Sequence, residues 1–154
     1  MDLELSDEQR MLVEQVRRYV RQEVDPLEAD MDPDAAELSA EDHERLVGIT
    51  TGMGLYQMDV PEEYGGAGLD VMTRTLLAME MSQHRAGLYA PCYGTFGSMG
   101  LAQLYDANDD QKDRYLYPTL AGEKRGFFGL TEPSGGSDPA RAIQTRAVQD
   151  GNDW

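Results

Sequence analysis

Apolar and polar positions recur with a helical period over the first part of the chain. Apolar side chains appear every three or four positions within residues 11–20, after a segment in which Ser6 is followed three residues later by Gln9. This spacing is that of a capping box, in which each side chain bonds the main-chain N–H of the other residue. The pattern predicts a first helix that begins at Ser6 and ends near Val24, because the position before a proline, here Pro26, disfavours helix.

The same two signals, apolar spacing and capping residues, predict the next two helices. Residues 25–36 are acidic and contain two prolines, so a loop is predicted there. A second helix is expected to begin at Ser39 and to be closed by Gly54 in the left-handed conformation. A third is expected to begin at Asp70 and to continue to about Arg85, and its apolar residues lie on more than one side, which is typical of a central helix.

Two further helical stretches follow, and the first is rich in small residues. Residues 91–105 contain three glycines, each of which weakens a helix by about 1 kcal/mol relative to alanine. They imply the close approach of another element or of a ligand. The second stretch is predicted to begin at Asn108, which forms another capping box with Gln111, and to end at Gly122.

The C-terminal part of the chain changes to strand-like patterns. An apolar run over residues 127–131 predicts a strand, residues 144–148 alternate as a second strand would, and Asp150-Gly151 predicts a type I′ hairpin turn. A strand without partners leaves main-chain donors and acceptors unpaired. We therefore expect an incomplete fold, either a fragment of a longer protein or a chain whose sheet a separate polypeptide completes.

A glycine-rich loop follows the first predicted strand. It turns at Pro133, and the adjacent Gly135 and Gly136 offer main-chain N–H groups with no side chain in the way. Thr131 and Ser137 add hydroxyls that can donate or accept hydrogen bonds. Such a loop suits a polar ligand that comes close to the main chain, and a plain surface turn between two strands is the alternative interpretation.

The charge balance limits the possible partners. The chain has 29 acidic and 13 basic residues and a net charge of -16, which argues against nucleic acid or an anionic membrane surface, because both polyanions would be repelled. Only Lys112 and Lys124 are lysines, and strong acidity with scarce lysine predicts a halophilic source, in which salt screens like charges.

The remaining composition predicts a cytoplasmic protein. Cys92 is the single cysteine, so no intrachain disulfide can form. The N-terminus is acidic where a signal peptide is basic, and no apolar run approaches membrane-spanning length. We expect no metal site.

Three longer segments of the chain, taken together, carry more specific information. Residues 130–138 read Leu-Thr-Glu-Pro-Ser-Gly-Gly-Ser-Asp, residues 60–70 read Val-Pro-Glu-Glu-Tyr-Gly-Gly-Ala-Gly-Leu-Asp, and residues 110–118 read Asp-Gln-Lys-Asp-Arg-Tyr-Leu-Tyr-Pro. In this order they resemble the motifs of the acyl-CoA dehydrogenase family, flavoenzymes that oxidise the Cα–Cβ bond of acyl-CoA thioesters. One position departs from the resemblance, because the family usually has a small residue where Arg141 stands.

The resemblance implies a fold, a cofactor and partners. Residues 1–122 would form the family's helical N-terminal domain and residues 123–154 the beginning of its middle β-domain, so the fold class is mainly α. The family binds FAD, converts acyl-CoA to the trans-2-enoyl-CoA, passes electrons to an electron-transfer flavoprotein and forms homo-oligomers, often tetramers. Gly129 and Pro139 make this chain especially similar to the glutaryl-CoA branch.

The resemblance also implies roles for individual residues. Flavin contacts are expected at the signature loop and the strand before it, namely at Phe128, Leu130, Thr131, Gly136 and Ser137. Ser137 would also touch the thioester or pantetheine. The acyl chain would contact the small-residue helix at Tyr93, Thr95, Phe96 and Ser98, for which plain helix packing is the alternative. Glu132 and Asp138 are expected to stabilise the loop by pairing with backbone donors.

The resemblance places no catalytic residue in this chain. The family's glutamate base lies in its C-terminal domain, which nothing here matches, so the 154 residues alone are expected to be inactive. A non-catalytic subunit that completes a split flavoprotein is an alternative. An acyl-CoA oxidase or a flavin monooxygenase of the same fold is another, and these would differ in how oxygen reaches the reduced flavin.

Overall fold

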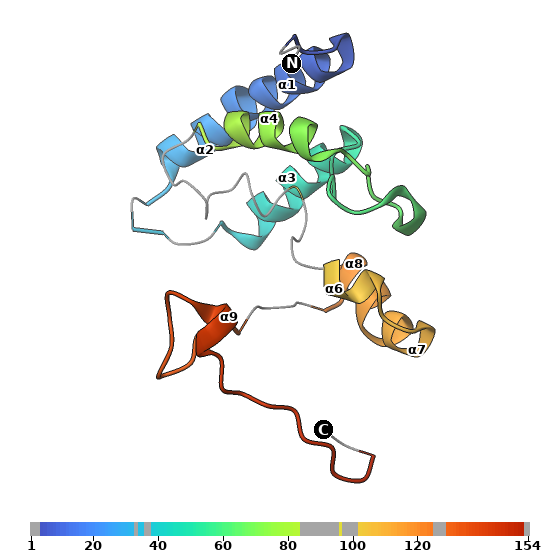
Figure 1. The fold of residues 1–154 in the computed structure, drawn as a ribbon. Helices are drawn as coiled ribbons and strands as arrows, with labels where there is room; N and C mark the ends of the chain where they lie inside the picture. Colours follow the sequence, from blue (N-terminus) through green and yellow to red (C-terminus); the bar gives the residue numbers. More distant parts are fainter. Residues whose placement is uncertain are drawn as a thin grey trace. The chain divides into compact units, whose positions relative to one another are not determined.

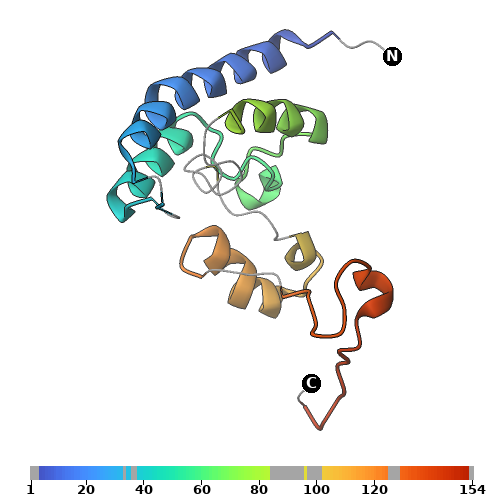
Figure 2. The same ribbon diagram turned by 90° about the vertical axis from the view of Figure 1, so that its left-hand side faces the viewer.

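A computed structural model describes residues 4–32, 34–35, 38–83, 96, 102–124 and 129–152. The chain divides into two compact units, Met1–Met99 and Gly100–Trp154, which Figures 1 and 2 show from two directions. The first unit contains α1 (Asp7–Tyr19), the π-helical segment η1 (Val20–Val24), α2 (Asp25–Asp30), α3 (Ala40–Gly52), the 3₁₀ turn η2 (Glu62–Tyr64) and α4 (Val71–Met81). The second contains α6 (Ala102–Tyr105), α7 (Asp109–Gln111), the π-helical segment η4 (Lys112–Leu116), α8 (Tyr117–Leu120) and α9 (Pro139–Ala142). The prediction of a mainly helical chain is confirmed.

The predicted helix starts are confirmed at all four N-caps, namely Ser6, Ser39, Asp70 and Asn108. Each side chain accepts a hydrogen bond from a main-chain N–H in the first turn of its helix, and the caps of α1 and α7 form complete capping boxes. Gly54 and Gly122 have φ of 72° and 76°, the left-handed conformation that ends a helix.

The predicted end of the first helix is wrong. The helical run continues through η1 into α2 and ends at Asp30, so the first half of the predicted loop at residues 25–36 is helical. A proline in an α-helix loses one hydrogen bond, and its ring clashes with the carbonyl four residues earlier. Here the N–H of Asp25 donates to the carbonyl of Val20, five residues earlier, and this wider π turn accommodates Pro26 near the start of the next α segment.

The second unit repeats this solution at Pro118. The N–H of Tyr117 donates to the carbonyl of Lys112, five residues earlier, and Pro118 lies in the first turn of α8. In a regular helix the carbonyl of Arg114 would accept from residue 118, which as proline has no N–H. The Lys124 ammonium donates to this carbonyl instead, over 2.6 Å.

The core of the first unit forms between α1, η1, α3 and α4. Its most buried apolar side chains include Val16, Leu46, Leu77 and Met81, each with an exposed fraction of 1% or less. The amide of Gln9 donates to Thr73 Oγ1 over 3.3 Å near the starts of α1 and α4. A second link, between Arg17 and Glu80, joins the same two helices near their C-terminal ends. The two links connect start to start and end to end, so α1 and α4 run parallel.

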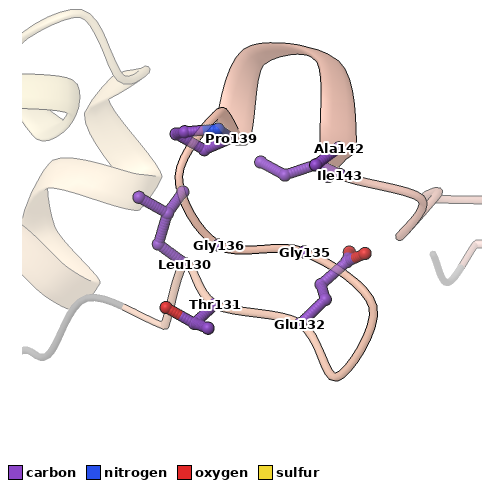
Figure 3. Close-up of a pocket in the computed structure, with 8 residues that line it drawn as sticks. All are labelled: Leu130, Thr131, Glu132, Gly135, Gly136, Pro139, Ala142 and Ile143. Atoms are coloured by element: carbon purple, nitrogen blue, oxygen red, sulfur yellow. The ribbon is translucent and has the colours of Figure 1, made fainter.

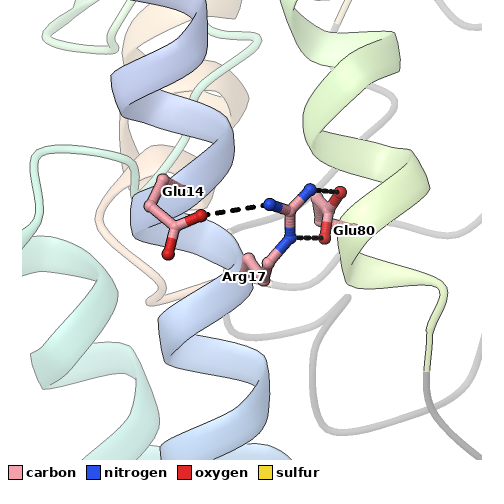
Figure 4. Close-up of polar contacts among 3 residues, drawn as sticks. All are labelled: Glu14, Arg17 and Glu80. Atoms are coloured by element: carbon pink, nitrogen blue, oxygen red, sulfur yellow. Dashed lines mark hydrogen bonds and ion pairs between the residues drawn. The ribbon is translucent and has the colours of Figure 1, made fainter.

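That second link is an ion pair between Arg17 of α1 and Glu80 of α4 (Figure 4). Arg17 Nη2 and Nε donate to the two oxygens of Glu80 over 2.7 and 3.0 Å, and Nη1 donates to Glu14 over 3.0 Å. The Glu80 side chain is 10% exposed, so its charge depends on this partner. The hydrogen bond and the charge of Glu80 raise the pKa of Arg17 above its ordinary value.

The two predicted strands are not formed in the described residues. Residues 129–131 and 144–149 have no strand partner there, and within the described part of the chain an isolated β-bridge occurs at Asp150 only. The type I′ prediction is also wrong, because Gly151 has a positive φ but Asp150 does not. Alternating apolar and polar residues indicate a segment that can form a β-strand. The hydrogen bonds of a β-ladder form only where a second strand supplies main-chain donors and acceptors.

The glycine-rich segment between α3 and α4 is a closely wrapped loop. Gln57 has φ of 56°, the one positive value among the described non-glycine residues, and its N–H donates to the carbonyl of Phe96 over 2.8 Å. Gly68 N–H donates to the carbonyl of Val60 over 2.9 Å. A Cβ on Gly66 would lie 2.1 Å from that same carbonyl oxygen, so the loop requires glycine there.

Two Gly→Ala substitutions test this loop. Gly66→Ala is expected to lower the free energy of unfolding by about 1–3 kcal/mol, because the main chain must move to admit the methyl group. Gly48→Ala, inside α3 with nothing within 4 Å of the added Cβ, is expected to raise it by about 0.5–1 kcal/mol. Chemical denaturation of the purified variants gives both values. Equal effects of the two substitutions would contradict the close approach to Val60.

Candidate functional site

The glycine-rich loop of the second unit forms a small, shallow hollow that is open to solvent (Figure 3). Its lining comes from the chain on both sides of the loop and from α9, namely Leu130, Thr131, Glu132, Gly135, Gly136, Pro139, Ala142 and Ile143. Three of the predicted flavin-binding residues therefore share one hollow, and these are Leu130, Thr131 and Gly136. Ser137 is exposed in the same loop but does not line the hollow.

The carboxylate of Glu132 holds the loop to the segment after α9. Its Oε2 accepts from the N–H of Gln144 over 2.8 Å, and its Oε1 accepts from the N–H of Thr145 over 2.8 Å and from the Thr145 hydroxyl. The hydroxyl bond, followed by the two main-chain bonds, lowers the pKa of Glu132 below its ordinary value. The prediction that Glu132 pairs with backbone donors is confirmed.

Asp138 behaves differently from the prediction. Its side chain makes no capping bond to α9 and instead lies 3.6 Å from the guanidinium of Arg141, with both side chains largely exposed. Its main-chain carbonyl accepts from the N–H of Ala142 over 2.9 Å. Arg141, the position that departs from the family pattern, thus lies in α9 with its charge turned to Asp138 and to solvent.

The two glycines of the loop have different surroundings. A Cβ on Gly135 would lie 3.0 Å from the Cβ of Ala142, whereas nothing lies within 4 Å of a Cβ on Gly136. A methyl group at position 135 would therefore crowd Ala142, which would have to move by a few tenths of an ångström. The open space beside Gly136 leaves its main chain accessible to a ligand.

The loop hydroxyls are available for binding. Thr131 and Ser137 are exposed, and within the described part of the chain neither hydroxyl has a hydrogen-bond partner. Figure 3 shows Thr131 and Glu132 pointing in different directions, as successive side chains of an extended segment do. Thr131 can therefore donate to a ligand while Glu132 holds the loop.

Of the four residues predicted to contact the acyl chain, the structure describes Phe96 alone. Tyr93, Thr95 and Ser98, together with the predicted flavin residue Phe128, lie outside the described residues. Phe96 is 3% exposed in the core of the first unit, and its ring meets the ring of Tyr19 edge-on with centroids 5.5 Å apart. Its contact with an acyl chain stays a prediction.

The structure adds residues that the sequence pattern did not single out. Ala142 and Ile143 complete the hollow, and Thr145 supplies two of the three bonds to Glu132. Thr145 lies 13 residues from Glu132, and no local spacing rule connects the two positions. The described residues contain no group of three His, Cys, Asp or Glu side chains placed to hold a metal ion, and none of their helices is both long and apolar enough to cross a membrane.

Comparison with known proteins places the chain in a family. Residues 6–123 match the family model described as the acyl-CoA dehydrogenase N-terminal domain. That match covers most of the chain, and the chain belongs to the acyl-CoA dehydrogenase family.

Individual relatives agree with this assignment. The chain is 36% identical over 94% of its length to a probable acyl-CoA dehydrogenase of Bacillus subtilis. It is 33% identical over 99% of its length to the human mitochondrial short-chain specific acyl-CoA dehydrogenase, and 34% identical over its whole length to (R)-benzylsuccinyl-CoA dehydrogenase of Thauera aromatica. The chain spans 23%, 35% and 40% of the lengths of these three proteins.

Two solved structures share the fold. Glutaryl-CoA dehydrogenase from Mycobacterium smegmatis matches 96% of this chain with a TM-score of 0.62 and 31% identity. A chain from a study of the electron transferring flavoprotein of Acidaminococcus fermentans matches 98% with a TM-score of 0.69 and 30% identity. This chain covers 36% and 38% of those two chains. Because the two identities are nearly equal, the glutaryl-CoA branch stays a prediction.

The bonds to Glu132 should depend on pH in a defined direction. A carboxylate whose pKa is lowered by folding stabilises the folded loop fully above its unfolded value, here 4.5, and loses this contribution as the pH falls through the lowered value. In an NMR titration, the amide resonances of Gln144 and Thr145 are expected to shift with a midpoint below 4.5. A midpoint at or above 4.5 would contradict the three hydrogen bonds.

Proposed function

We propose that this chain is the N-terminal portion of an FAD-dependent acyl-CoA dehydrogenase. Residues 1–122 form its helical domain and residues 123–154 begin the middle β-domain. The observation that supports the proposal best is the hollow beside the signature loop, which Thr131 and Gly136 both line. The Thr131 hydroxyl has no hydrogen-bond partner among the described residues, and the space beside Gly136 is open. Membership in the family gives this hollow its ligand class.

The residues that line the hollow offer the kinds of contact that a flavin ring makes. A flavin ring is flat, largely apolar on its faces and polar at one edge. Leu130 is 40% exposed and Ile143 is 46% exposed, so both side chains offer apolar surface to a ligand. The Thr131 hydroxyl can donate one hydrogen bond. A side chain at position 136 would occupy space that glycine leaves open.

In the proposed enzyme, the FAD held by these residues would supply the acceptor for the hydride that leaves the β-carbon of the acyl-CoA. The residues of this chain bind and orient the reactants. Thr131 donates to the polar edge of the flavin ring, with Phe128 and Leu130 against the ring. Ser137 lies beside the flavin and touches the thioester or the pantetheine, and the stretch with Tyr93, Thr95, Phe96 and Ser98 contacts the acyl chain. The base that takes the α-proton comes from another part of the enzyme.

The partners and setting follow from the same proposal. Electrons pass to an electron-transfer flavoprotein, and the enzyme is a cytoplasmic homo-oligomer. The net charge of -16 supports a halophilic source, since high salt screens the repulsion among acidic side chains.

A flavin spectrum of the protein purified at high salt, with the mass of every co-eluting polypeptide, tests the proposal. We expect absorbance bands of bound flavin. A second polypeptide that elutes with the flavin would favour the alternative of a split enzyme in which this chain is the non-catalytic subunit. Protein purified with its complete set of polypeptides but free of flavin, and unable to take up added FAD, would contradict both.

Gly136→Ala locates the flavin on the loop. Because nothing in the chain lies within 4 Å of the added methyl group, the thermal stability of flavin-free protein is expected to change little. The affinity for FAD is expected to fall about tenfold or more, a loss of about 1.4 kcal/mol or greater. Gly48→Ala in α3 is the matched control and should leave the affinity unchanged. Equal FAD affinity in Gly136→Ala and the unmodified protein would place the flavin elsewhere.

A further inference from the structure

The loop contains a carboxylate whose bonds are all directed to the protein itself. We infer that Glu132 is the positioning residue of the flavin site, because it fixes the direction in which its neighbour Thr131 presents its hydroxyl. This inference rests on the proposed function, since Thr131 needs a fixed direction only if it binds a ligand.

Residue 132 is held at both its side chain and its main chain. The carboxylate accepts from two successive main-chain N–H groups and one hydroxyl, at Gln144 and Thr145. The main-chain carbonyl of Glu132 accepts from the N–H of Gly135 over 3.1 Å. The Glu132 side chain therefore links the start of the loop to residues 144–145 at its end. The hydrogen bond from Gly135 to the Glu132 carbonyl closes the turn between these two residues. Little rotation is left to the peptide that joins residues 131 and 132.

The bonds require a carboxylate at this position. One oxygen accepts from Gln144 and the other accepts twice from Thr145. A glutamine has one acceptor oxygen, and its NH₂ group can only donate. Whichever way the amide is turned, at least one main-chain N–H at residues 144–145 loses its partner. Glu132→Gln should therefore release one end of the loop while the size of the side chain at position 132 stays nearly the same.

The other carboxylate of the loop provides a matched comparison. Asp138 is 55% exposed in its side chain and lies 3.6 Å from Arg141, which is 88% exposed. An ion pair this exposed contributes little to conformation. Asp138→Asn removes the same charge from the same loop without touching residues 144–145, so any effect that comes from charge alone appears equally in both variants.

A double-mutant cycle on FAD affinity tests the positioning role. The protein is purified with every polypeptide that accompanies it, and FAD affinity is measured for Glu132→Gln, Thr131→Val and the double variant. Glu132→Gln is expected to weaken FAD binding about tenfold, and Asp138→Asn less than twofold. In the Thr131→Val background the effect of Glu132→Gln is expected to shrink to about threefold or less, because the hydroxyl that Glu132 orients is gone.

A readout that needs no flavin keeps the inference testable on its own. Hydrogen exchange of the Gln144 and Thr145 amides is expected to accelerate at least tenfold in Glu132→Gln and to stay unchanged in Asp138→Asn. Thr145→Val should accelerate exchange partially, and Thr145→Ser, which keeps the hydroxyl, should restore the unmodified rate.

The outcomes separate the two proposals. Unmodified protein that binds no FAD overturns the proposed function and, with it, the positioning role. FAD binding with equal affinities in Glu132→Gln and Asp138→Asn, or with additive effects of the Glu132 and Thr131 substitutions, leaves the proposed function standing and overturns the role of Glu132. Unchanged amide exchange in Glu132→Gln overturns the link between the two ends of the loop.

Discussion

The first unit depends on the parallel pairing of α1 and α4, which the Arg17–Glu80 ion pair fixes. Glu80 is nearly buried, and a buried carboxylate without its partner would be strongly unfavourable. The fork of Arg17 satisfies both of its oxygens and reaches Glu14 on the same helix. With these helices in register, the most buried side chains, among them Val16 and Leu77, can pack together. The ion pair therefore specifies the alignment, and apolar burial supplies most of the stability.

Two prolines impose a second constraint, and both are met in the same way. Pro26 and Pro118 each lie in the first turn of a short helix that continues a π-helical segment. In each case the residue two before the proline, Val24 or Leu116, is fully buried. Packing thus holds the backbone helical through a position where the hydrogen-bond ladder is incomplete. At Pro118 the ammonium of Lys124 supplies the missing donor, which gives one of the two lysines a structural role.

The proposed flavin site offers mainly neutral groups to a ligand, although the chain as a whole is acidic. The eight residues that line the hollow include no lysine or arginine. Its one charged member, Glu132, has its oxygens occupied by donors of the chain itself. What remains for a ligand is neutral, the Thr131 hydroxyl and the main chain at Gly136. Binding at this loop would therefore depend on shape and directed hydrogen bonds, which salt weakens far less than it weakens ion pairs.

The sequence alone determined whatever rests on neighbouring residues. It predicted the four N-caps and the closing glycines, because a cap or a turn is formed by side chains within about four positions. That Glu132 accepts from backbone donors was implied by the family resemblance, and its partners, 12 and 13 residues away, were not predicted. Its ordered motifs also pointed to the family. Tertiary structure decided the rest. The helix through Pro26 persists because Val24 is buried. The predicted strands are not formed in the described residues, which supply no partner strand. Arg17 meets Glu80 across 63 residues of chain. Each of these outcomes depends on contacts between distant segments, which no local pattern encodes.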